Sequence, residues 1–425
     1  MRILWLTNQV PANISTAFGL QSPVTGGWLD NSIQLLAKEN ELHVLFPINL
    51  DSEPIVAESQ GIKGYGVPMY KGTLRPDKRT IKMLETYVKE ISPDIIHVWG
   101  TEYLHSYMMM VALNNLELQN RAVISIQGLV SVYARHFYGH IMDWKTRIPT
   151  LKDIYFKEGL VHQRRIFRVR GEYEKEAIRL SKYAIGRTDW DYACVKQINP
   201  DIRYFYCNEI LRKSFYSERW DIKKCEKHTI FLSQCAYPIK GLHHVLEALN
   251  ILKNSWEDIH LNVIGRDLTI DNWKERLLDN SYDKYNRTLI RKYELERYVT
   301  FLPLQTAEEM RECFLKANVF VMASSIENSP NSLGEAMLLG VPCVVTDVGG
   351  VKNMLTHEVE GFVYQADAPY MMAYYIDKLF RDDELAVRYG NAASKHAEIT
   401  HNQSINNKEL QRIYMEISGD GETYE

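Results

Sequence analysis

The sequence lacks several features that would point to particular classes of protein. It has only six cysteines, and none forms a Cys-x-x-Cys pair or lies with histidine at a zinc-like spacing. No apolar run approaches the roughly 20 residues that are needed to span a bilayer. The net charge is only −4, which gives no overall attraction to nucleic acid or to an anionic membrane. These absences predict a soluble cytoplasmic protein with reduced thiols, no structural metal and no nucleic-acid partner.

What the sequence does contain is a series of short apolar runs that alternate with helical patterns. The opening residues, MRILWLTNQV, have the character of a first strand rather than of a signal peptide. Strands that are apolar throughout and alternate with helices are typical of parallel sheets covered on both faces. The predicted strands are 3–7, 42–46, 95–98 and 122–126 in the first half and 229–232, 260–264, 319–322 and 343–346 in the second, with helices at 27–38, 243–253 and 307–314.

Two such series in 425 residues predict two domains, because the chain exceeds one comfortable hydrophobic core. A stretch without strands lies around 130–180, and the boundary is placed within residues 206–221, which precede the charged run 223–227. We therefore expect an α/β protein with two doubly wound, parallel-sheet, Rossmann-like domains, 1–217 and 218–399, that face a central cleft. Ligands of such sheets collect outside the carboxyl ends of the strands.

The stretch ENSPNSLGEAMLLGVPCVV, residues 327–345, joins one predicted strand to the next through a helix. Glu327 lies in the loop after the strand, Ser329 is a good N-cap, and Pro330 suits the first helical position. The helix is expected to end at Gly340. Its start would present unpaired amides, which suit a phosphate. The residues that carry these amides are Asn331, Ser332 and Leu333.

Glu335 lies one turn further into this helix. A carboxylate beside an anion site is repelled by the phosphate, so it is better suited to bind hydroxyl groups such as those of a ribose or a sugar. The simpler alternative is a capped surface helix on which the two glutamates have no special role.

These residues resemble the signature of the family-four retaining glycosyltransferases, which have the GT-B fold. Glu327 and Glu335 match the family's Glu-x7-Glu pattern, and a Gly-x-Pro turn and a Gly-Gly loop follow, here Gly340-Val341-Pro342 and Gly349-Gly350. Upstream, IKGLHHVLEAL (239–249) resembles the family's Lys-Gly followed by a helix. The resemblance is dense over 229–365, looser in the N-terminal half, and closest to enzymes of bacterial cell-surface or capsular polysaccharides.

The resemblance implies roles for individual residues. Glu327 would bind donor-sugar hydroxyls near the reacting centre, and Glu335 would bind the ribose hydroxyls. Lys240 would neutralise the leaving diphosphate, because a fixed cation stabilises the charge that develops as the glycosidic bond breaks. Without this context a Lys-Gly pair is usually an ordinary loop lysine. The other implied donor-binding residues are Asn331, Ser332, Leu333, the glycine pair Gly26 and Gly27, and Gly265 with Arg266 in NVIGRD.

Two positions depart from the family's pattern. Cys235 stands where many relatives place an arginine as a second diphosphate clamp. Either the helix amides and Arg266 make up for it, or the affinity for the donor is lower. Gln127 stands where many relatives carry histidine; a glutamine can hydrogen-bond a substrate but cannot act as a base.

Two further stretches have ambiguous patterns. Asp189 and Asp191 resemble the metal-binding Asp-x-Asp of the GT-A class, but they follow Arg187-Thr188 at the start of a helical pattern, which favours a helix cap. No metal and no cofactor is therefore predicted. Residues 155–170 are basic and aromatic, which is compatible with peripheral contact at the inner face of the membrane or with a solvated helix face. The tail, 400–425, is expected to form a helix that crosses back to the first domain, as in GT-B relatives.

The sequence thus predicts retaining, metal-independent transfer of a sugar from a nucleotide-diphosphate-sugar to a hydroxyl of a glycan or lipid-linked glycan. Because a fold does not fix the chemistry, a nucleotide-sugar epimerase or a phosphorylase is an alternative. A weak or inactive sugar-nucleotide-binding partner in a polysaccharide assembly complex is another, and Cys235 and Gln127 leave it open.

Overall fold

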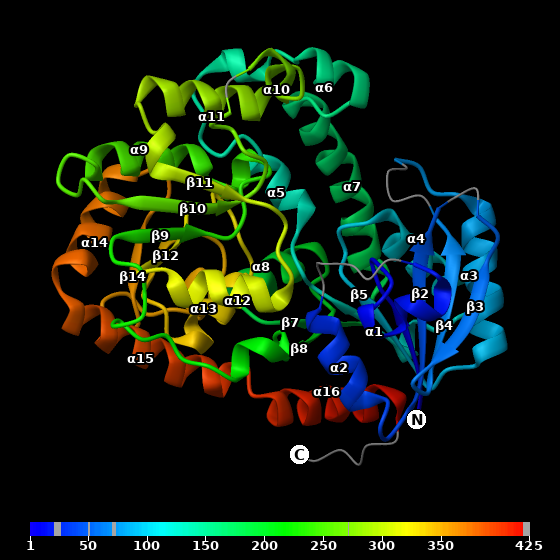
Figure 1. The fold of residues 1–425 in the computed structure, drawn as a ribbon. Coiled ribbons are helices and arrows are strands. Elements are labelled where there is room, and N and C mark those ends of the chain that lie inside the picture. Colours follow the sequence, from blue (N-terminus) through cyan, green and yellow to red (C-terminus); the bar gives the residue numbers. More distant parts are fainter. Residues whose placement is uncertain (21–26, 50–51, 70–73, 271, 420–425) are drawn as a thin grey trace. The chain divides into compact units, whose positions relative to one another are not determined.

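The computed structural model describes residues 1–20, 27–49, 52–69, 74–270 and 272–419. The strands form two sheets, one with the order β3-β4-β2-β1-β5-β6-β7-β8 and one with the order β11-β10-β9-β12-β13-β14 (Figure 1). The contacts divide the chain into a first unit, Met1–Tyr133, Phe167–Arg212 and His401–Glu425, and a second unit, Ala134–Ile166 and Lys213–Thr400. The prediction of two parallel-sheet α/β domains is confirmed.

The first unit is built around the eight-stranded sheet. Its strands are β1 (Arg2–Leu6), β2 (Glu41–Ile48), β3 (Ile55–Ser59), β4 (Ile62–Pro68), β5 (Ile95–Trp99), β6 (Ala122–Ser125), β7 (Tyr183–Gly186) and β8 (Arg203–Tyr206). Its helices are α1 (Ala12–Ser15), η1 (Thr16–Phe18), α2 (Trp28–Leu36), α3 (Lys78–Ile91), α4 (Leu104–Asn115), η2 (Gln119–Arg121), α8 (Asp189–Ile198) and α16 (Gln403–Ser418), while α5 (Val130–His136) and α7 (Leu160–Leu180) run across the unit boundaries.

The second unit is built around the six-stranded sheet. Its strands are β9 (Thr229–Leu232), β10 (His260–Ile264), β11 (Val299–Leu302), β12 (Val319–Met322), β13 (Cys343–Asp347) and β14 (Phe362–Gln365). Its helices are η3 (Trp144–Arg147), α6 (Leu151–Phe156), η4 (Lys213–Tyr216), η5 (Pro238–Lys240), α9 (Leu242–Leu252), α10 (Trp273–Leu277), α11 (Ser281–Lys292), η6 (Glu296–Tyr298), α12 (Ala307–Lys316), α13 (Asn331–Leu339), η7 (Val351–Asn353), α14 (Pro369–Arg381) and α15 (Asp383–Thr400).

Strand β1 shows why the first sheet needs helices on both faces. Ile3 and Trp5 belong to one buried cluster, together with residues of α2 and α16. Leu4 and Leu6 belong to another, with residues of α3, α4 and α7. Since successive side chains of a strand point to opposite faces, an all-apolar strand is stable only when both faces are covered.

Helix α16 completes one of these faces. It lies alongside α2 (Figure 1). The Trp5 Nε1–H donates to the Tyr414 hydroxyl at 3.0 Å, and His97 Nδ1 lies 2.5 Å from the same oxygen. Burial holds the pKa of His97 well below its usual value, so this ring is neutral. The last described helix is thus part of the core that contains the first strand.

Two features of the fold differ from the prediction. Strand β3 runs antiparallel to β4 at the sheet edge, in a hairpin whose turn residues Gln60 and Gly61 have φ of 55° and 74°. The segment 134–166, predicted to lie in the first domain, groups with the second unit. Its attachment is polar, because the Thr150 hydroxyl donates to the Asp279 carbonyl at 2.9 Å and the Ser281 amide donates to Asp153 at 2.9 Å.

The strand orders identify where ligands are expected. In the second sheet β9 lies between β10 and β12, so the chain winds first to one side of β9 and then to the other. The order matches the doubly wound dinucleotide-binding arrangement, in which ligands bind where the direction reverses. This switch point brings together the loops that follow β9 and β12.

The Asp189–Asp191 stretch is a helix cap, as predicted. The Thr188 hydroxyl accepts from the Asp191 amide, and the Asp191 carboxylate closes a capping box at the start of α8.

Candidate functional site

The structure brings Lys240 and Glu327 together at the switch point of the second sheet. Lys240 Nζ lies 2.6 Å from Glu327 Oε1, and the Ser324 hydroxyl donates to the same oxygen at 2.8 Å. The two charged side chains are mostly buried, with 19% and 9% of their side-chain surface exposed. The two residues are 87 positions apart in the sequence, and the prediction assigned both of them to the donor site.

The glycine after Lys240 allows this approach. Gly241 has a φ of 75°, and a Cβ on it would lie 2.0 Å from the carbonyl oxygen of Ala323, just beyond β12. The neighbouring Ser325 amide donates to the Ile239 carbonyl at 2.8 Å. The loop after β9 is therefore held against the end of β12 by backbone contacts that leave no room for a side chain at position 241.

The Gly-Gly loop after β13 fixes the other partner. A Cβ on Gly349, whose φ is 52°, would lie 1.7 Å from the Glu327 carbonyl oxygen. The Gly350 amide donates to that same oxygen at 3.2 Å. The Lys-Gly and Gly-Gly motifs thus have a common local role, which is to hold the backbones of Lys240 and Glu327 in place.

Electrostatics keep Lys240 charged. Burial by itself lowers the pKa of this ammonium, but the nearby Glu327 carboxylate outweighs burial, and the net effect raises the pKa above its usual value. Lys240 is therefore a permanent cation over the physiological pH range. A fixed, partly desolvated cation is well suited to stabilise a phosphate group.

Helix α13 begins one residue later than predicted. Pro330 is its N-cap, with extended φ and ψ of −69° and 119°, and no side chain caps the helix. The Leu333 amide donates to the Pro330 carbonyl at 3.0 Å, so the expectation that this amide is unpaired was wrong. Asn331 and Ser332 remain at the helix start. Gly340 ends the helix with a φ of 79°, as predicted.

Glu335 is 3% exposed and lies in the second turn of α13. Its assignment to ribose hydroxyls stays a prediction.

Cys235 and Gly265 fit together at the neighbouring strand ends. Cys235 Sγ donates to the Ile264 carbonyl at 3.2 Å, and a Cβ on Gly265 would lie 2.3 Å from that sulfur. Burial raises the pKa of the Cys235 thiol to about 12, so the position where relatives carry an arginine is neutral here.

Arg266 makes contacts that compete with a role in donor binding. Its guanidinium lies 2.7 Å from Asp279 Oδ1 and 3.2 Å from Asp283, and it donates to the Leu278 carbonyl at 2.7 Å. Asp279 is also paired with the buried Arg287 at 2.8 Å. These ion pairs tie α10 and α11 to the end of β10.

The predicted glycine pair of the first unit is only partly described. Gly26 lies outside the described residues. Gly27 is the N-cap of α2, with a φ of −61°, and a Cβ there would make only ordinary contacts of 3.6 Å with Arg212. Nothing in this local geometry demands a glycine at position 27.

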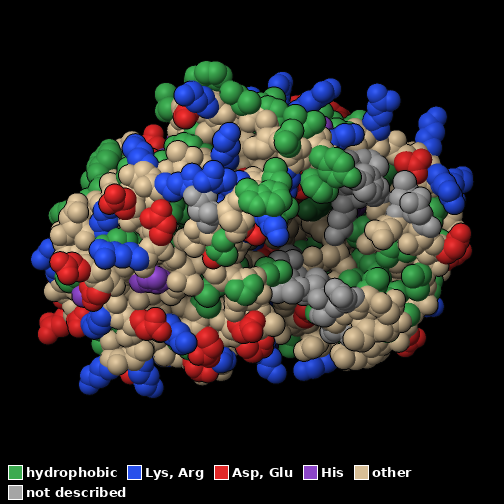
Figure 2. Space-filling model, turned by 45° about the horizontal axis from the view of Figure 1, so that its top comes forward, with side chains coloured by type: hydrophobic (Ala, Val, Ile, Leu, Met, Phe, Trp, Pro, Cys, Tyr) green, Lys and Arg blue, Asp and Glu red, His purple; other side chains and the backbone are tan. Residues whose placement is uncertain are grey.

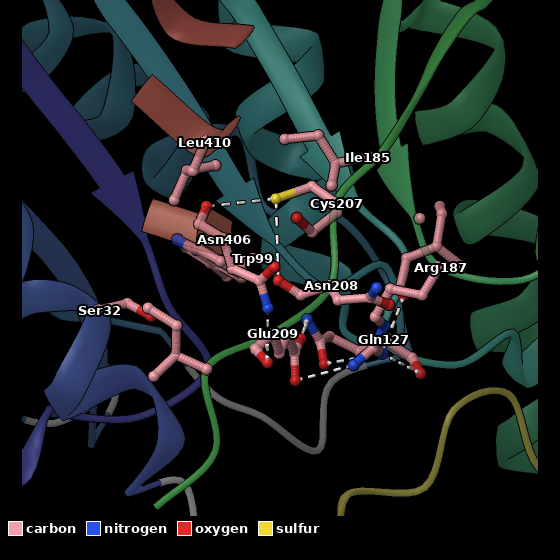
Figure 3. A pocket seen from close by; sticks show the side chains of 14 residues that line it. Ser32, Trp99, Gln127, Ile185, Arg187, Cys207, Asn208, Glu209, Asn406 and Leu410 are labelled. Carbon is pink, nitrogen blue, oxygen red and sulfur yellow. Dashed lines mark hydrogen bonds and ion pairs between the residues drawn. The ribbon is translucent and has the colours of Figure 1, made fainter. Parts of the chain in front are cut away.

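A pocket in the first unit lies at the carboxyl ends of β5, β6, β7 and β8 (Figure 3). In it Gln127, Arg187 and Glu209 point toward one another. Arg187 Nη1 lies 2.8 Å from Glu209 Oε2, with both side chains at most 6% exposed, and Gln127 Nε2 donates to Glu209 Oε1 at 2.5 Å. The rest of the lining is Ser32, Trp99, Ser125, Ile126, Ile185, Gly186, Cys207, Asn208, Ile210, Asn406 and Leu410.

The sequence singled out Gln127 but missed Arg187 and Glu209 as its partners. Arg187 directly follows β7, and Glu209 follows β8, a short strand with two exposed residues that was not predicted. The wall beside them is held by α16 and the residues just before it, because Asn406 Nδ2 of α16 donates to the Glu209 carbonyl at 3.4 Å and His401 Nδ1 lies 3.0 Å from the same oxygen. Burial raises the pKa of the Cys207 thiol to about 12, so this lining residue is not a nucleophile.

A buried glutamate lies nearby in the same unit. Glu174 of α7 accepts hydrogen bonds from the Val130 and Ser131 amides, at 3.0 and 2.8 Å, and from the Thr101 hydroxyl at 2.9 Å. Burial raises the pKa of this carboxyl group to about 7, despite the hydrogen bonds that oppose the shift. It caps α5, just beyond the pocket residue Gln127.

Among the residues that the structure describes, no group of three or more His, Cys, Asp or Glu side chains could hold a metal ion. In the same described part of the chain, no helix is both long enough and apolar enough to cross a membrane.

Solved structures with the same fold cover nearly the whole chain. A sucrose-phosphate synthase from Thermosynechococcus elongatus aligns with a TM-score of 0.71 and 14% identity, over 99% of this chain and 100% of that one. The Anabaena protein HepE in complex with UDP aligns with a TM-score of 0.64 and 15% identity, over 98% and 100%. These likenesses show the fold, which is GT-B.

The model of the family described as glycosyl transferases group 1 matches residues 213–396, which lie in the second unit. A putative glycosyltransferase of Bacillus subtilis, YtcC, is 28% identical over 204 residues, which are 48% of each chain. The chain thus spans about half the length of the curated relatives that it matches. The matched region contains Lys240, Glu327 and Glu335, and the pocket of the first unit lies outside it.

Proposed function

We propose that this protein is a retaining glycosyltransferase that moves a sugar from a nucleotide-diphosphate-sugar to a hydroxyl of a glycan or lipid-linked glycan. The observation that carries the proposal is the Lys240–Glu327 pair, 2.6 Å apart at the switch point of the second sheet. It lies within the region that matches the glycosyltransferase family. The UDP in the HepE structure supports a nucleotide donor by analogy of fold.

In the proposed reaction the diphosphate leaves from the face on which the acceptor hydroxyl then attacks, so the anomeric configuration is retained. Lys240 stabilises the negative charge of the leaving diphosphate, and the amides of Asn331 and Ser332 at the start of α13 assist. Glu327 and Glu335 accept hydrogen bonds from donor hydroxyls. The mechanism uses no metal ion and no covalent enzyme intermediate.

We assign acceptor binding to the pocket of the first unit. Gln127 is held by Glu209, and Arg187 neutralises that carboxylate. An amide fixed in this way can orient a hydroxyl group by hydrogen bonding, but it cannot remove a proton. The acceptor proton must therefore leave by another route, and departure with the diphosphate oxygen satisfies this requirement in a same-face mechanism.

The proposal is tested by incubating the protein with UDP-, GDP- and ADP-sugars and following nucleotide release with and without EDTA. One donor should be consumed, EDTA should have no effect, and NMR of the product should show the anomeric configuration of the donor. Lys240→Met should lower kcat by about 10²–10³-fold, the usual effect of removing one group that stabilises the transition state. Lys253→Met is the control, because Lys253 is a half-buried lysine of the same unit that bonds the Tyr293 carbonyl.

A second candidate is a protein that binds sugar nucleotides without turning them over. The neutral Cys235 thiol favours it, because this position then adds no positive charge to the diphosphate site. Calorimetric binding of a nucleotide-sugar with no nucleotide release, for every acceptor tried, would support this candidate over the transferase. Conversion of the sugar without an acceptor would indicate an epimerase.

A further inference from the structure

One surface of the second unit exposes hydrophobic side chains at an unusual density. Half of the large hydrophobic residues that are exposed in the described chain fall in two short segments, 142–161 and 270–278. Several are more than two-thirds exposed: Met142 at 92%, Tyr155 at 80%, Leu151 at 75% and Trp273 at 69%. The others are Trp144, Ile148, Ile154, Phe156, Val161, Ile270, Leu277 and Leu278.

Helix α6 has the reverse of the usual amphipathic arrangement. Its single fully buried residue is Asp153, which accepts a hydrogen bond from the Ser281 amide at 2.9 Å. Four of its six residues are exposed hydrophobic side chains, Leu151, Ile154, Tyr155 and Phe156. A surface helix normally buries its apolar face and exposes its charges. Here the acid anchors the helix and the apolar side chains are left exposed.

The two segments form one surface, which we call the α6–α10 surface (described residues 142–161, 270 and 272–278). Thr150, at the start of α6, bonds the carbonyl of Asp279, which follows α10. Leu151 and Leu277 line the same groove. Arg266 and Arg287 both form ion pairs with Asp279, which follows α10, and these pairs fix the end of that helix. Large exposed apolar patches of this kind mark interaction sites.

The charge around this surface identifies the partner. The protein as a whole has a net charge of −4, yet among the described residues of the two segments and of α11 the exposed acids are only Asp143 and Glu158. Glu275 and Asp283 are partly buried and are paired with Arg266. Figure 2 shows green hydrophobic and blue basic side chains mixed over its upper part, where α6, α10 and α11 lie in Figure 1. The exposed basic residues on these segments and the adjoining α11 are Lys145, Arg147, Lys157, Lys274, Arg276, Lys284, Arg291 and Lys292.

We propose that the α6–α10 surface docks on the surface of an anionic lipid bilayer. Apolar side chains insert at the headgroup boundary, while lysine and arginine side chains are attracted to anionic lipids. A second copy of the chain would bring the same positive charge against itself, which argues against self-association. Docking is peripheral, because no described helix can span the bilayer.

This surface overlaps the segment 155–170 that the sequence suggested, through Tyr155 and Phe156, but extends well beyond it. Two arginines of α7 are engaged with the protein: Arg164 donates to the Ala134 carbonyl at 3.0 Å, and Arg170 donates to the Glu102 carbonyl at 2.5 Å. Arg165 and Arg168 of the same helix are exposed. Apart from Val161 at the start of α7, the exposed apolar residues of this surface lie before α7 or in and beside α10. The sequence could not show that 270–278 joins them.

The test is co-sedimentation of the full chain with vesicles of phosphatidylcholine alone or with one-third phosphatidylglycerol, at low and high salt. The wild type should bind the anionic vesicles, and high salt should weaken this binding. The triple variant Leu151→Ser, Tyr155→Ser, Trp273→Ser should bind at least about tenfold more weakly. The matched control is Leu304→Ser, Tyr370→Ser, Ile399→Ser, which removes three side chains of similar exposure elsewhere on the same unit and should bind like the wild type.

A charge variant tests whether the basic side chains attract anionic lipids. Lys145→Glu, Lys274→Glu, Lys284→Glu should abolish the preference for anionic vesicles. Equal thermal unfolding midpoints establish that all variants fold. Wild type that stays in the supernatant with both vesicle types, or equal binding by both serine triples, overturns the proposal. So does a concentration-dependent dimer, seen by light scattering, that only the α6–α10 serine triple dissolves. Binding is measured without donor or acceptor, so its outcome is independent of the proposed reaction.

Discussion

The two sheets end in polar sites that are built in different ways. At the edge of the second sheet, one lysine and one glutamate from two loops meet, and glycines that touch backbone carbonyls set their positions. At the edge of the first sheet, residues after three strands form a buried network, and charge pairing holds Arg187 and Glu209 in place.

This difference explains why one kind of site can be recognised from the sequence and the other cannot. A site positioned by backbone contact leaves glycines at fixed places, because no other residue fits. A site positioned by buried charges leaves only scattered polar residues, since many arrangements satisfy the same pairing. Each kind of site should also fail in its own way when it is altered.

The largest effect is expected for the buried pair of the first unit. Arg187→Met leaves Glu209 charged, buried and without its cation, which should lower the free energy of unfolding of this unit by about 3–5 kcal/mol. Adding Glu209→Gln removes the uncompensated charge and should restore most of the loss. Thermal unfolding followed by calorimetry measures both. If the free energy of unfolding of Arg187→Met lies within about 1 kcal/mol of the wild-type value, the Arg187–Glu209 ion pair does not hold this site together.

An intermediate effect is expected for Gly241→Ala in the second unit. The left-handed φ alone costs about 1–2 kcal/mol for alanine, and the Cβ would lie 2.0 Å from the Ala323 carbonyl oxygen. Gly61→Ala is the matched control, because Gly61 has a φ of 74° and nothing within 4 Å of its Cβ position. Both variants should lose the roughly 1–2 kcal/mol of folding stability that alanine costs at a left-handed φ.

Only Gly241→Ala should also displace Lys240 and lower kcat. A displacement of 1 Å can lower the rate by roughly 10²-fold. If the two alanine variants are equally stable and equally active, backbone contact does not position the lysine.

The smallest effect is a pH dependence of the first unit. The folded pKa of Glu174 is raised to about 7, so the folded state binds this proton more tightly than the unfolded state does. Stability from this group is therefore present at low pH and is lost as the pH rises through 7. Glu174→Gln should remove the dependence. The advantage of the wild type over this variant should fall by about 1–2 kcal/mol between pH 5.5 and 7. A difference that stays constant over this range would place the Glu174 pKa outside it.

The sequence predicted the regular parts of the fold well, and the exceptions have local causes. The apolar strands β9, β10 and β12 lie where they were expected. The β3–β4 hairpin was missed because its turn is Gln60-Gly61 rather than the more readily recognised Asn-Gly. The cap of α13 was misplaced by one residue, because the Pro330 carbonyl pairs with the Leu333 amide and the Ser329 side chain does not cap the helix.

The candidate site was predictable where it is local. Lys240 and Glu327 were assigned because their short motifs resemble a family signature, and the structure brings the two side chains to 2.6 Å; their roles stay a prediction. Arg187 and Glu209 lie 60 and 82 residues from Gln127, and neither has a local pattern that reveals the pairing. For Arg266 the ion pairs with Asp279 and Asp283 depend on where α10 and α11 pack, which the sequence alone does not show.

The position of α16 in the core of the first unit has a consequence for folding during synthesis. Multidomain chains generally fold their N-terminal domain first during synthesis. Here the core around Trp5 also needs Tyr414, a residue that the ribosome adds 409 positions later. The second unit ends at Thr400, so it contains no part of that helix. The core around the first strand, which is translated first, can thus be completed only after residues 403–418 have been made.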